Sequence, residues 1–293
     1  MKITTYSVGS KTGVGLVMED RTVDLTAAGI APSVQALIEG GSALLERARA
    51  VAAEEEAPTV PTEAYFLAPI PIPKRNIFCI GKNYREHAKE FGQSGFDGGS
   101  KGGDEVPDAP IIFTKATTSV SANGDPILSS LDVDSSVDYE GELGVIIGKG
   151  GRGISIADAP SHIFGYTVIN DVTARESQKR NKQWVLGKGV DTFCPMGPVI
   201  VTADAIDNVK DLRVVTTVNG EVRQNAPVSD LIFDIPTLIE TISAVITLQP
   251  GDIIATGTPA GVGIGFSPPR YLQPGDVVEV QINPIGTLKN PIV

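Results

Sequence analysis

The stretch that most constrains this chain is residues 137–148, which read V-D-Y-E-G-E-L-G-V-I-I-G. Apolar and polar residues alternate there with a period of two, which predicts a β-strand. One face of that strand carries the apolar side chains Val137, Tyr139, Leu143, Val145 and Ile147. The other face carries three acids with no cation between them, Asp138, Glu140 and Glu142. Side chains two residues apart in a strand point the same way, about 7 Å apart at the backbone.

Three neighbouring carboxylates on one strand face have two interpretations. Without compensation they repel one another and raise each other's pKa. A divalent hard cation removes that repulsion, because carboxylate oxygens are the ligands that Mg²⁺, Mn²⁺ and Ca²⁺ prefer. The alternative is an acidic face turned toward solvent on a surface strand. The motif by itself leaves both interpretations open.

Composition and net charge exclude several classes of protein. A chain of 293 residues is long enough for one large domain, or for a large domain with a small one. Hydrophobic residues at 41% and charged residues at 20% are typical of a soluble globular protein. The net charge of −11 argues against nucleic acid and anionic membranes as partners. We see no apolar run long enough for a transmembrane helix, and no apolar segment of a secretory signal at the N-terminus.

The few cysteines and histidines limit the kinds of metal site. Cys79 and Cys194 are too few for a disulfide framework or a zinc cluster, so a reducing cytoplasm is the expected location. With only His87 and His162, a multi-histidine site is excluded. Any metal is therefore expected to be held mainly by oxygen.

Residues 1–70 read as a small N-terminal α+β domain. Short strands are expected at 3–8, 14–19 and 22–25. Ser33 can cap a helix that runs to about residue 55. Residues 54–61 are polar and contain proline, which favours a linker.

Residues 71–293 read as the larger, β-rich domain. A buried strand at 77–80 precedes a helix over 85–91, and a second helix is expected to begin near Asp171 after a strand at 163–169. Residues 92–109 are rich in Gly, Ser and Asp, which predicts a lid over a functional site. The glycines of residues 148–153 match no phosphate-binding pattern, so we interpret them as a hairpin connection. Strands dominate after residue 199, with a hairpin signal at Asn219-Gly220 and a helix over 235–247.

Three further sets of residues are candidates for chemistry. His87 and Glu90 are spaced to share one face of a helix, where the carboxylate can orient the imidazole as a general base. Asp171 lies where a strand gives way to a helix, and Lys188 can stabilise a developing oxyanion. Each has a plainer alternative: a surface ion pair, a helix cap and an exposed lysine, respectively.

Between residues 70 and 293, a series of sequence blocks resembles the fumarylacetoacetate hydrolase superfamily, in order and with normal spacing. The blocks are G-K-N-Y-R-E-H-A-K-E, P-I-I-F-T-K, D-Y-E-G-E-L-G-V-I-I-G, G-Y-T-V-I-N-D-V-T-A-R-E-S-Q, W-V-L-G-K-G-V-D-T-F-C-P-M-G-P, T-V-N-G-E-V-R-Q and P-G-D-I-I-A-T-G-T-P-A-G-V-G. Bacterial acylpyruvase-like and 2-keto acid hydrolase-like members resemble the chain most. Residues 1–70 resemble the variable N-terminal part of longer bacterial members.

The resemblance implies a fold and a set of site residues. The fold class is α+β and β-rich, with a rolled mixed sheet, peripheral helices and the small N-terminal domain, assembled as a homodimer. One Mg²⁺ or Mn²⁺ would be held by Glu140, Glu142 and Asp171. Catalytic roles fall on His87, Glu90 and Lys188. Substrate-contacting roles fall on Lys115, Gln178 and Thr258, whereas Arg175 is expected to be structural.

The resemblance also implies a reaction. We expect hydrolysis of a C–C bond in a small anionic 2-oxo acid, a β-diketo acid of the acylpyruvate or fumarylpyruvate type. The same metal site also suits an isomerase, a decarboxylase or a 2-keto-3-deoxy sugar-acid dehydratase or hydrolase. An idle metal-binding or interaction protein is disfavoured by the intact H-x-x-E and K-G motifs. The further metal-ligating aspartate of fumarylacetoacetase proper has no clear match, so that substrate is not expected.

Overall fold

One large mixed sheet forms the centre of the molecule in the computed structural model, which describes residues 1–95 and 106–293. Its strands are β1 (Lys2–Val8), β2 (Lys11–Val17), β3 (Thr22–Asp24), β4 (Tyr65–Leu67), β5 (Ile77–Gly81), β6 (Ile111–Lys115), β7 (Val120–Ser121), β9 (Gly141–Ile147), β10 (Ile163–Asn170), β12 (Cys194–Thr202) and β15 (Ile253–Ala255). The strand order is β3-β2-β1-β12-β10-β9-β15-β5-β6, with β4 paired to β1 and β7 paired to β12. The predicted β-rich, mixed-sheet fold is confirmed.

Two smaller sheets and six α-helices complete the fold within residues 1–95 and 106–293. The short strands β8 (Val137–Asp138) and β11 (Thr173–Ala174) pair with each other. A four-stranded sheet has the order β14-β13-β16-β17 and contains β13 (Arg213–Val218), β14 (Glu221–Pro227), β16 (Val277–Ile282) and β17 (Gly286–Pro291). The helices are α1 (Val34–Glu39), α2 (Gly41–Ala52), α3 (Arg85–Gln93), α4 (Arg175–Asn181), α5 (Val185–Lys188) and α6 (Ile235–Val245).

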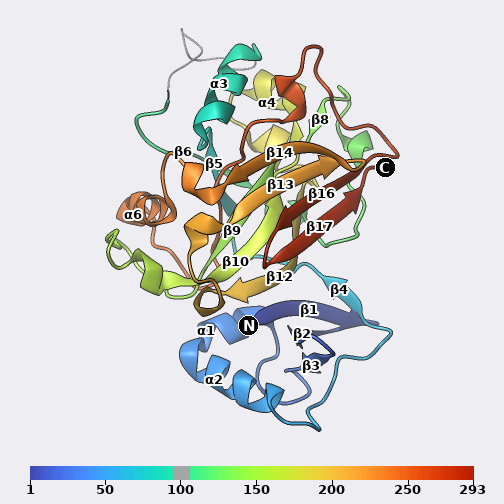
Figure 1. The fold of residues 1–293 in the computed structure, drawn as a ribbon, viewed down its shortest axis with the longest axis vertical. Helices are drawn as coiled ribbons and strands as arrows, with labels where there is room; N and C mark the ends of the chain where they lie inside the picture. The colour runs from blue at the N-terminus through green and yellow to red at the C-terminus, as the bar shows by residue number, and fades with distance from the viewer. Residues whose placement is uncertain (96–105) are drawn as a thin grey trace.

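The main hydrophobic core lies between the central strands and the four-stranded sheet (Figure 1). Leu143 and Val145 of β9 belong to the same cluster as Val214 of β13 and Val280 of β16. All seven residues of β9 are buried, so both of its faces are covered. The alternation in the sequence therefore separates two buried environments, one apolar and one charged.

The N-terminal strands continue the central sheet. β1 pairs with β12 in antiparallel register, with Lys2 opposite Val201, and a second buried cluster joins Leu37 of α1 to Ile146 of β9. In Figure 1 the N-terminal segment packs against one end of the larger part, next to β12. The predicted boundary at residue 70 stays a prediction.

Three predicted elements are shorter or broken in the structure. The helix expected over 33–55 is two helices, because Gly41, the first residue of α2, adopts φ +58. Ser33 does cap α1. The strand expected over 137–148 is interrupted at Tyr139–Glu140. The helix expected near Asp171 begins at Arg175, after β11.

Side chains replace the strand hydrogen bonds at the interruption before β9. Asn170 Oδ1 accepts from the backbone N–H of Glu140 at 3.0 Å, and Gln224 Oε1 accepts from that of Gly141 at 3.0 Å. Because these two N–H groups are bonded to side chains, the backbone can leave the strand here without burying an unpaired donor. This turn separates Glu140 from the regular strand and leaves Asp138 and Glu140 on either side of Arg175, which contacts both.

The hairpin expected at Asn219-Gly220 joins β13 to β14. Both residues adopt positive φ, 52° and 80°, as a two-residue type I′ turn requires. Within residues 1–95 and 106–293, no helix is both long enough and apolar enough to cross a membrane. Most of the lid predicted over 92–109 lies outside the described residues.

Candidate active site

Three buried carboxylates meet where β9 and β10 run side by side. Glu142 lies in β9, Glu140 just before it, and Asp171 just after β10. The antiparallel register pairs Asn170 with Gly141, which brings Asp171 next to Glu140. One carboxylate oxygen from each residue lies within 4.8 Å of the others. These three residues and Asp138 are each at most 5% exposed, so the interpretation of Asp138, Glu140 and Glu142 as a solvated acidic face is wrong.

Two lysines neutralise part of this charge. Lys188 Nζ lies 2.8 Å from Glu140 Oε2 and 2.8 Å from Asp171 Oδ2. Lys115 Nζ lies 2.7 Å from Asp171 Oδ1 and donates to the carbonyls of Val172 and Lys188. Both lysines are at most 2% exposed, so the interpretation of Lys188 as an exposed lysine is wrong.

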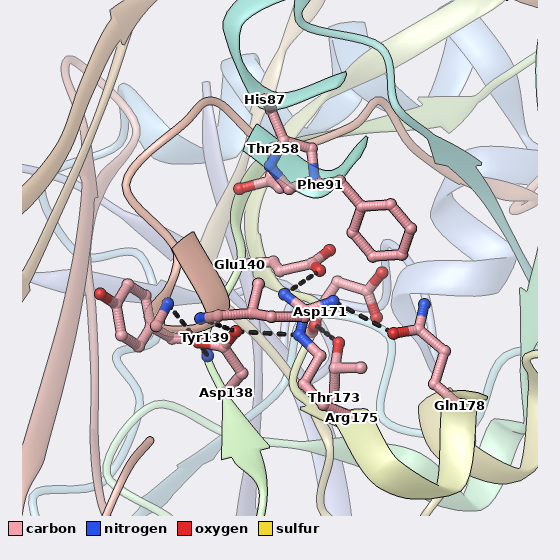
Figure 2. Close-up of polar contacts among 12 residues, drawn as sticks. His87, Phe91, Asp138, Tyr139, Glu140, Asp171, Thr173, Arg175, Gln178 and Thr258 are labelled. Atoms are coloured by element: carbon pink, nitrogen blue, oxygen red, sulfur yellow. Dashed lines mark hydrogen bonds and ion pairs between the residues drawn. The ribbon is translucent and has the colours of Figure 1, made fainter. Parts of the chain in front are cut away.

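Arg175 supports the carboxylates from the other side (Figure 2). Its Nε lies 2.9 Å from Asp138 Oδ2, and its terminal nitrogens lie 2.7 Å from Glu140 Oε1 and 3.2 Å from Gln178 Oε1. Asp138 also accepts the backbone N–H groups of Gly263 and Ile264 at 2.6 and 3.0 Å. Arg175 therefore fixes the direction of Glu140 and at the same time lines the pocket described below.

Glu142 differs from its two neighbours because no salt bridge reaches it from the described part of the chain. Its Oε2 accepts the backbone N–H of Gly257 at 2.8 Å. Burial, reinforced by Asp171 and Glu140, raises the pKa of Glu142 well above its ordinary value. Burial also raises the pKa of Glu140, but Lys188 and Arg175 outweigh it and bring the value to about 2.

The donor set fits a divalent cation. Four buried carboxylates, those of Asp138, Glu140, Glu142 and Asp171, face the three buried cations Lys115, Arg175 and Lys188. The uncompensated negative charge is centred on Glu142, where a hard cation held by carboxylate oxygens would neutralise it. Glu140, Glu142 and Asp171 are therefore the residues that would hold a divalent metal ion.

His87 and Glu90 form a pair on α3, in which His87 is buried and Glu90 is partly buried. His87 Nδ1 lies 3.2 Å from Glu90 Oε2, and the backbone N–H of Gly261 donates to Glu90 Oε1 at 2.9 Å. His87 is 4% exposed, so the interpretation as an exposed surface ion pair is wrong. With the Nδ1 proton directed at Glu90, Nε2 keeps a lone pair and can act as a base.

One pocket lies between His87 of α3 and Glu140. It is lined by Ile80, Gly81, Lys82, His87, Phe91, Phe113, Glu140, Arg175, Gln178, Trp184, Lys188 and Thr258. In Figure 2 His87 and Thr258 lie on one side of Glu140, and Arg175 lies on the other side with Gln178. A histidine base and a candidate metal ligand therefore face the same small volume.

Of the three residues predicted to contact the substrate, two line the pocket and one does not. Gln178 and Thr258 line the pocket, and Thr258 Oγ1 is fixed between the carbonyl of Gly141 and the amide of Gln224. Lys115 is fully buried behind Asp171 and is not among the residues lining this pocket, so here it supports Asp171 and α5.

An aromatic wall was missed in the sequence. Trp184 packs on Phe113 with ring centroids 5.2 Å apart and on Phe91 at 6.3 Å. The spacing of Phe91 from His87, and of Trp184 from Lys188, is four residues in both cases. On helices this spacing places side chains on one face, so it was a usable signal.

The chain is similar to one protein family and to several named enzymes. The family model described as fumarylacetoacetate (FAA) hydrolase C-terminal matches residues 76–293. Oxaloacetate tautomerase YisK of Bacillus subtilis is 45% identical over 309 aligned residues, which cover 100% of both chains.

Two solved structures share the fold over the whole chain. A fumarylacetoacetate hydrolase from psychrophilic Exiguobacterium antarcticum is 40% identical, with a TM-score of 0.84 and coverage of 100% of this chain and 99% of that one. Maleylpyruvate hydrolase from Sphingobium sp. SYK-6, in complex with manganese(II) and pyruvate, is 31% identical, with a TM-score of 0.80 and the same coverage. The names of these proteins cover tautomerisation as well as hydrolysis.

Proposed function

The chain belongs to the fumarylacetoacetate hydrolase family, and on that basis we propose that it is a divalent-metal-dependent tautomerase of 2-oxo acids. Oxaloacetate is the first substrate to test, because the tautomerase of Bacillus subtilis is similar over its full length. The observation that carries the proposal is the shared pocket of His87 and Glu140. Keto–enol conversion needs a base at C3 and a stabilised oxygen at C2, and these two residues stand on opposite sides of one small volume.

The residues of this chain suit both parts of the reaction. When bound, a divalent cation would supply a Lewis acid for the 2-oxo oxygen. His87 Nε2 would take the proton from C3, and the C–H electron pair would form the C2–C3 double bond. The C2–O π electrons would move to the oxygen, which would then take the proton back from the His87 imidazolium. Glu90, 3.2 Å from Nδ1, would stabilise the imidazolium that forms. Lys188 and Arg175 keep Glu140 ionised and directed at the pocket.

Hydrolysis of an acylpyruvate is the second candidate. The His87–Glu90 pair favours it, because a histidine oriented by a carboxylate can equally take a proton from water. The similarity to maleylpyruvate hydrolase supports it too. Both reactions pass through the enolate of a 2-oxo acid. Decarboxylation, isomerisation and dehydration of 2-oxo acids pass through such an enolate too, so the same site suits them.

A substrate panel distinguishes these reactions. We expect purified enzyme with Mg²⁺ or Mn²⁺ to speed the loss of the enol of oxaloacetate, followed by its ultraviolet absorbance. Acylpyruvates and 2-keto-3-deoxy sugar acids are run in parallel, with products identified by NMR. Cleavage of an acylpyruvate without any effect on oxaloacetate enol would replace the first candidate by the second. The homodimer stays a prediction, which sedimentation velocity checks.

Gly265 gives a prediction about how Glu90 is held. A Cβ at this position would lie 2.0 Å from Glu90 Oε1, so Gly265→Ala must push the carboxylate away from its place. We expect kcat to fall about 10-fold or more, since a displaced group no longer orients the base. Affinity for the metal, measured by calorimetry, should be unchanged.

A double mutant provides the control for Gly265. Once Glu90→Ala removes the carboxylate, the added methyl has nothing to displace there. The double mutant Glu90→Ala/Gly265→Ala should then match Glu90→Ala alone. If the losses of kcat in the two single mutants instead multiply in the double mutant, Gly265→Ala does not act through Glu90.

A further inference from the structure

We infer that Tyr139 is a positioning residue for the His87–Glu90 pair on α3, and that it acts on this pair through the backbone of Gly261. The inference rests on the proposed function, because it takes His87 as the base. It goes further in giving a role to a side chain that the sequence pattern placed on the apolar face of a strand.

The hydroxyl of Tyr139 makes a contact that an apolar core position does not need. Tyr139 is fully buried at the interruption before β9, and its ring belongs to the main hydrophobic core. A phenylalanine would fill the same space. The hydroxyl donates to the carbonyl of Gly261 at 2.8 Å, across 122 positions of the chain. The phenol therefore adds one directed bond to an otherwise apolar side chain.

Gly261 joins Tyr139 to Glu90. Its carbonyl accepts from Tyr139, and its N–H donates to Glu90 Oε1 at 2.9 Å. Only the φ and ψ of this residue separate the two groups, so a contact that holds the carbonyl also holds the N–H. The conformation suits glycine alone, because φ is +105 and a Cβ would lie 1.9 Å from the carbonyl oxygen of Arg223.

The segment 257–264 is held at both ends by buried carboxylates. Its first N–H donates to Glu142 Oε2 at 2.8 Å, and its last two N–H groups donate to Asp138 at 2.6 and 3.0 Å. Gly261 lies between these ends, and glycine has more conformational freedom to lose than any other residue. The middle of the segment therefore needs a contact of its own, and the hydroxyl of Tyr139 supplies it.

The consequence for the reaction lies in the tautomer of His87. Glu90 Oε2 lies 3.2 Å from His87 Nδ1, and the side chain of Glu90 is 16% exposed, so it can turn toward solvent unless it is held. When Nδ1 has no acceptor for its proton, the imidazole can carry that proton on Nε2, which is then no base. By holding Glu90 in place, Tyr139 keeps His87 in the tautomer that the proposed reaction needs.

Tyr139→Phe tests this inference, because it removes the hydroxyl and keeps the ring. We expect kcat for oxaloacetate to fall by about 3- to 10-fold, the range that corresponds to one neutral hydrogen bond. The KM and the affinity for Mg²⁺ should change little. In a Glu90→Ala background the same substitution should cause no further loss, because the group that it positions is gone.

Tyr6→Phe is the matched control. Tyr6 is also buried, and its hydroxyl donates to Asp24 Oδ2 at 2.6 Å in the N-terminal strands. The control therefore removes a buried hydroxyl and its hydrogen bond far along the sheet from α3. We expect it to leave kcat unchanged.

Nuclear magnetic resonance of the histidine side chains gives a readout without turnover. The chain has two histidines, so labelling histidine with ¹⁵N gives few signals, and His162 serves as an internal reference. The nitrogen shifts report which ring nitrogen carries the proton. With Mg²⁺ present at alkaline pH, wild-type His87 should carry it on Nδ1. Tyr139→Phe should move part of it to Nε2 and Glu90→Ala should move more, whereas Tyr6→Phe should match wild type.

Three results would overturn the inference. They are His87 nitrogen shifts in Tyr139→Phe that equal those of wild type, losses of kcat that multiply when Tyr139→Phe and Glu90→Ala are combined, and an equal loss in Tyr6→Phe. Wild type that does not tautomerise oxaloacetate would overturn the proposed function instead. The His87 nitrogen shifts would still decide whether Tyr139 positions the pair.

Discussion

Changing Glu142 to Gln is expected to abolish tight binding of Mg²⁺ or Mn²⁺ and to stabilise the metal-free protein. Burial raises the pKa of Glu142, and its carboxylate accepts a hydrogen bond from Gly257 N–H that a glutamine oxygen can also accept. The substitution removes a buried charge without leaving that donor unpaired. Activity should fall to the level of the chelator-treated enzyme, a loss of at least about 100-fold for a missing catalytic metal.

The stability effect has a defined pH dependence. Below the ordinary carboxyl pKa of 4.5, Glu142 is protonated in both the folded and the unfolded chain. As the pH rises from there through the raised folded pKa, the unfolded chain ionises first, so the metal-free wild type loses stability. Glu142→Gln lacks this loss, and the difference in free energy of unfolding should widen with pH.

Urea unfolding at several pH values, with the metal removed, measures this difference, and calorimetry measures metal affinity. The exposed Glu19→Gln changes the charge equally and should behave like wild type. Normal metal affinity in Glu142→Gln would remove Glu142 from the proposed ligand set.

Replacing His87 by Ala is expected to lower kcat by about 10²- to 10⁴-fold, the usual contribution of a general base. The fold and the metal affinity should survive, because no bond joins His87 to the carboxylates or to their lysines in the described part of the chain. Glu90→Ala should lose less, since Glu90 orients the imidazole and does not itself take the proton. The double mutant should be little worse than His87→Ala, because the two residues act as one unit.

Rates of the three variants on oxaloacetate, each with its circular dichroism spectrum and metal affinity, test this prediction. Exchange of the exposed Glu86 on the same helix for Gln is the matched control and should leave kcat unchanged. If His87→Ala keeps more than about a tenth of the wild-type rate, well short of that loss, proton transfer by this residue is refuted.

The carboxylates and the His–Glu pair could be predicted from the sequence, because each depends on the spacing of residues within one strand or one helix. Glu140 and Glu142 follow the strand period, and His87 and Glu90 follow the helix period, so each pair is brought together by local geometry alone. Their burial could not be predicted. The same alternation describes a half-exposed strand and a strand covered on both faces, and only the packing of the four-stranded sheet over β9 decides between them.

Contacts between segments distant in the sequence could not be predicted either, because they also depend on tertiary packing. The break before β9 needs Asn170 and Gln224, and the position of Lys115 behind Asp171 needs the pairing of β5 with β6 at the edge of the sheet. The break between α1 and α2 is different, because Gly40-Gly41 is visible in the sequence as a weak point of the helix. The apolar residues on either side of it keep the spacing of one helix, which predicted a continuous helix instead.

The central claim is that His87 moves a proton of a 2-oxo acid bound at Glu140, Glu142 and Asp171. The most direct measurement is the rate at which the enol of oxaloacetate disappears, followed by absorbance. Wild-type enzyme reloaded with Mg²⁺ or Mn²⁺ is compared with chelator-treated enzyme and with metal-loaded His87→Ala. We predict rapid conversion by the metal-loaded wild type, with the other two near the rate in buffer. A chelator-treated enzyme as fast as the metal-loaded one, or a wild type no faster than buffer, would contradict the account.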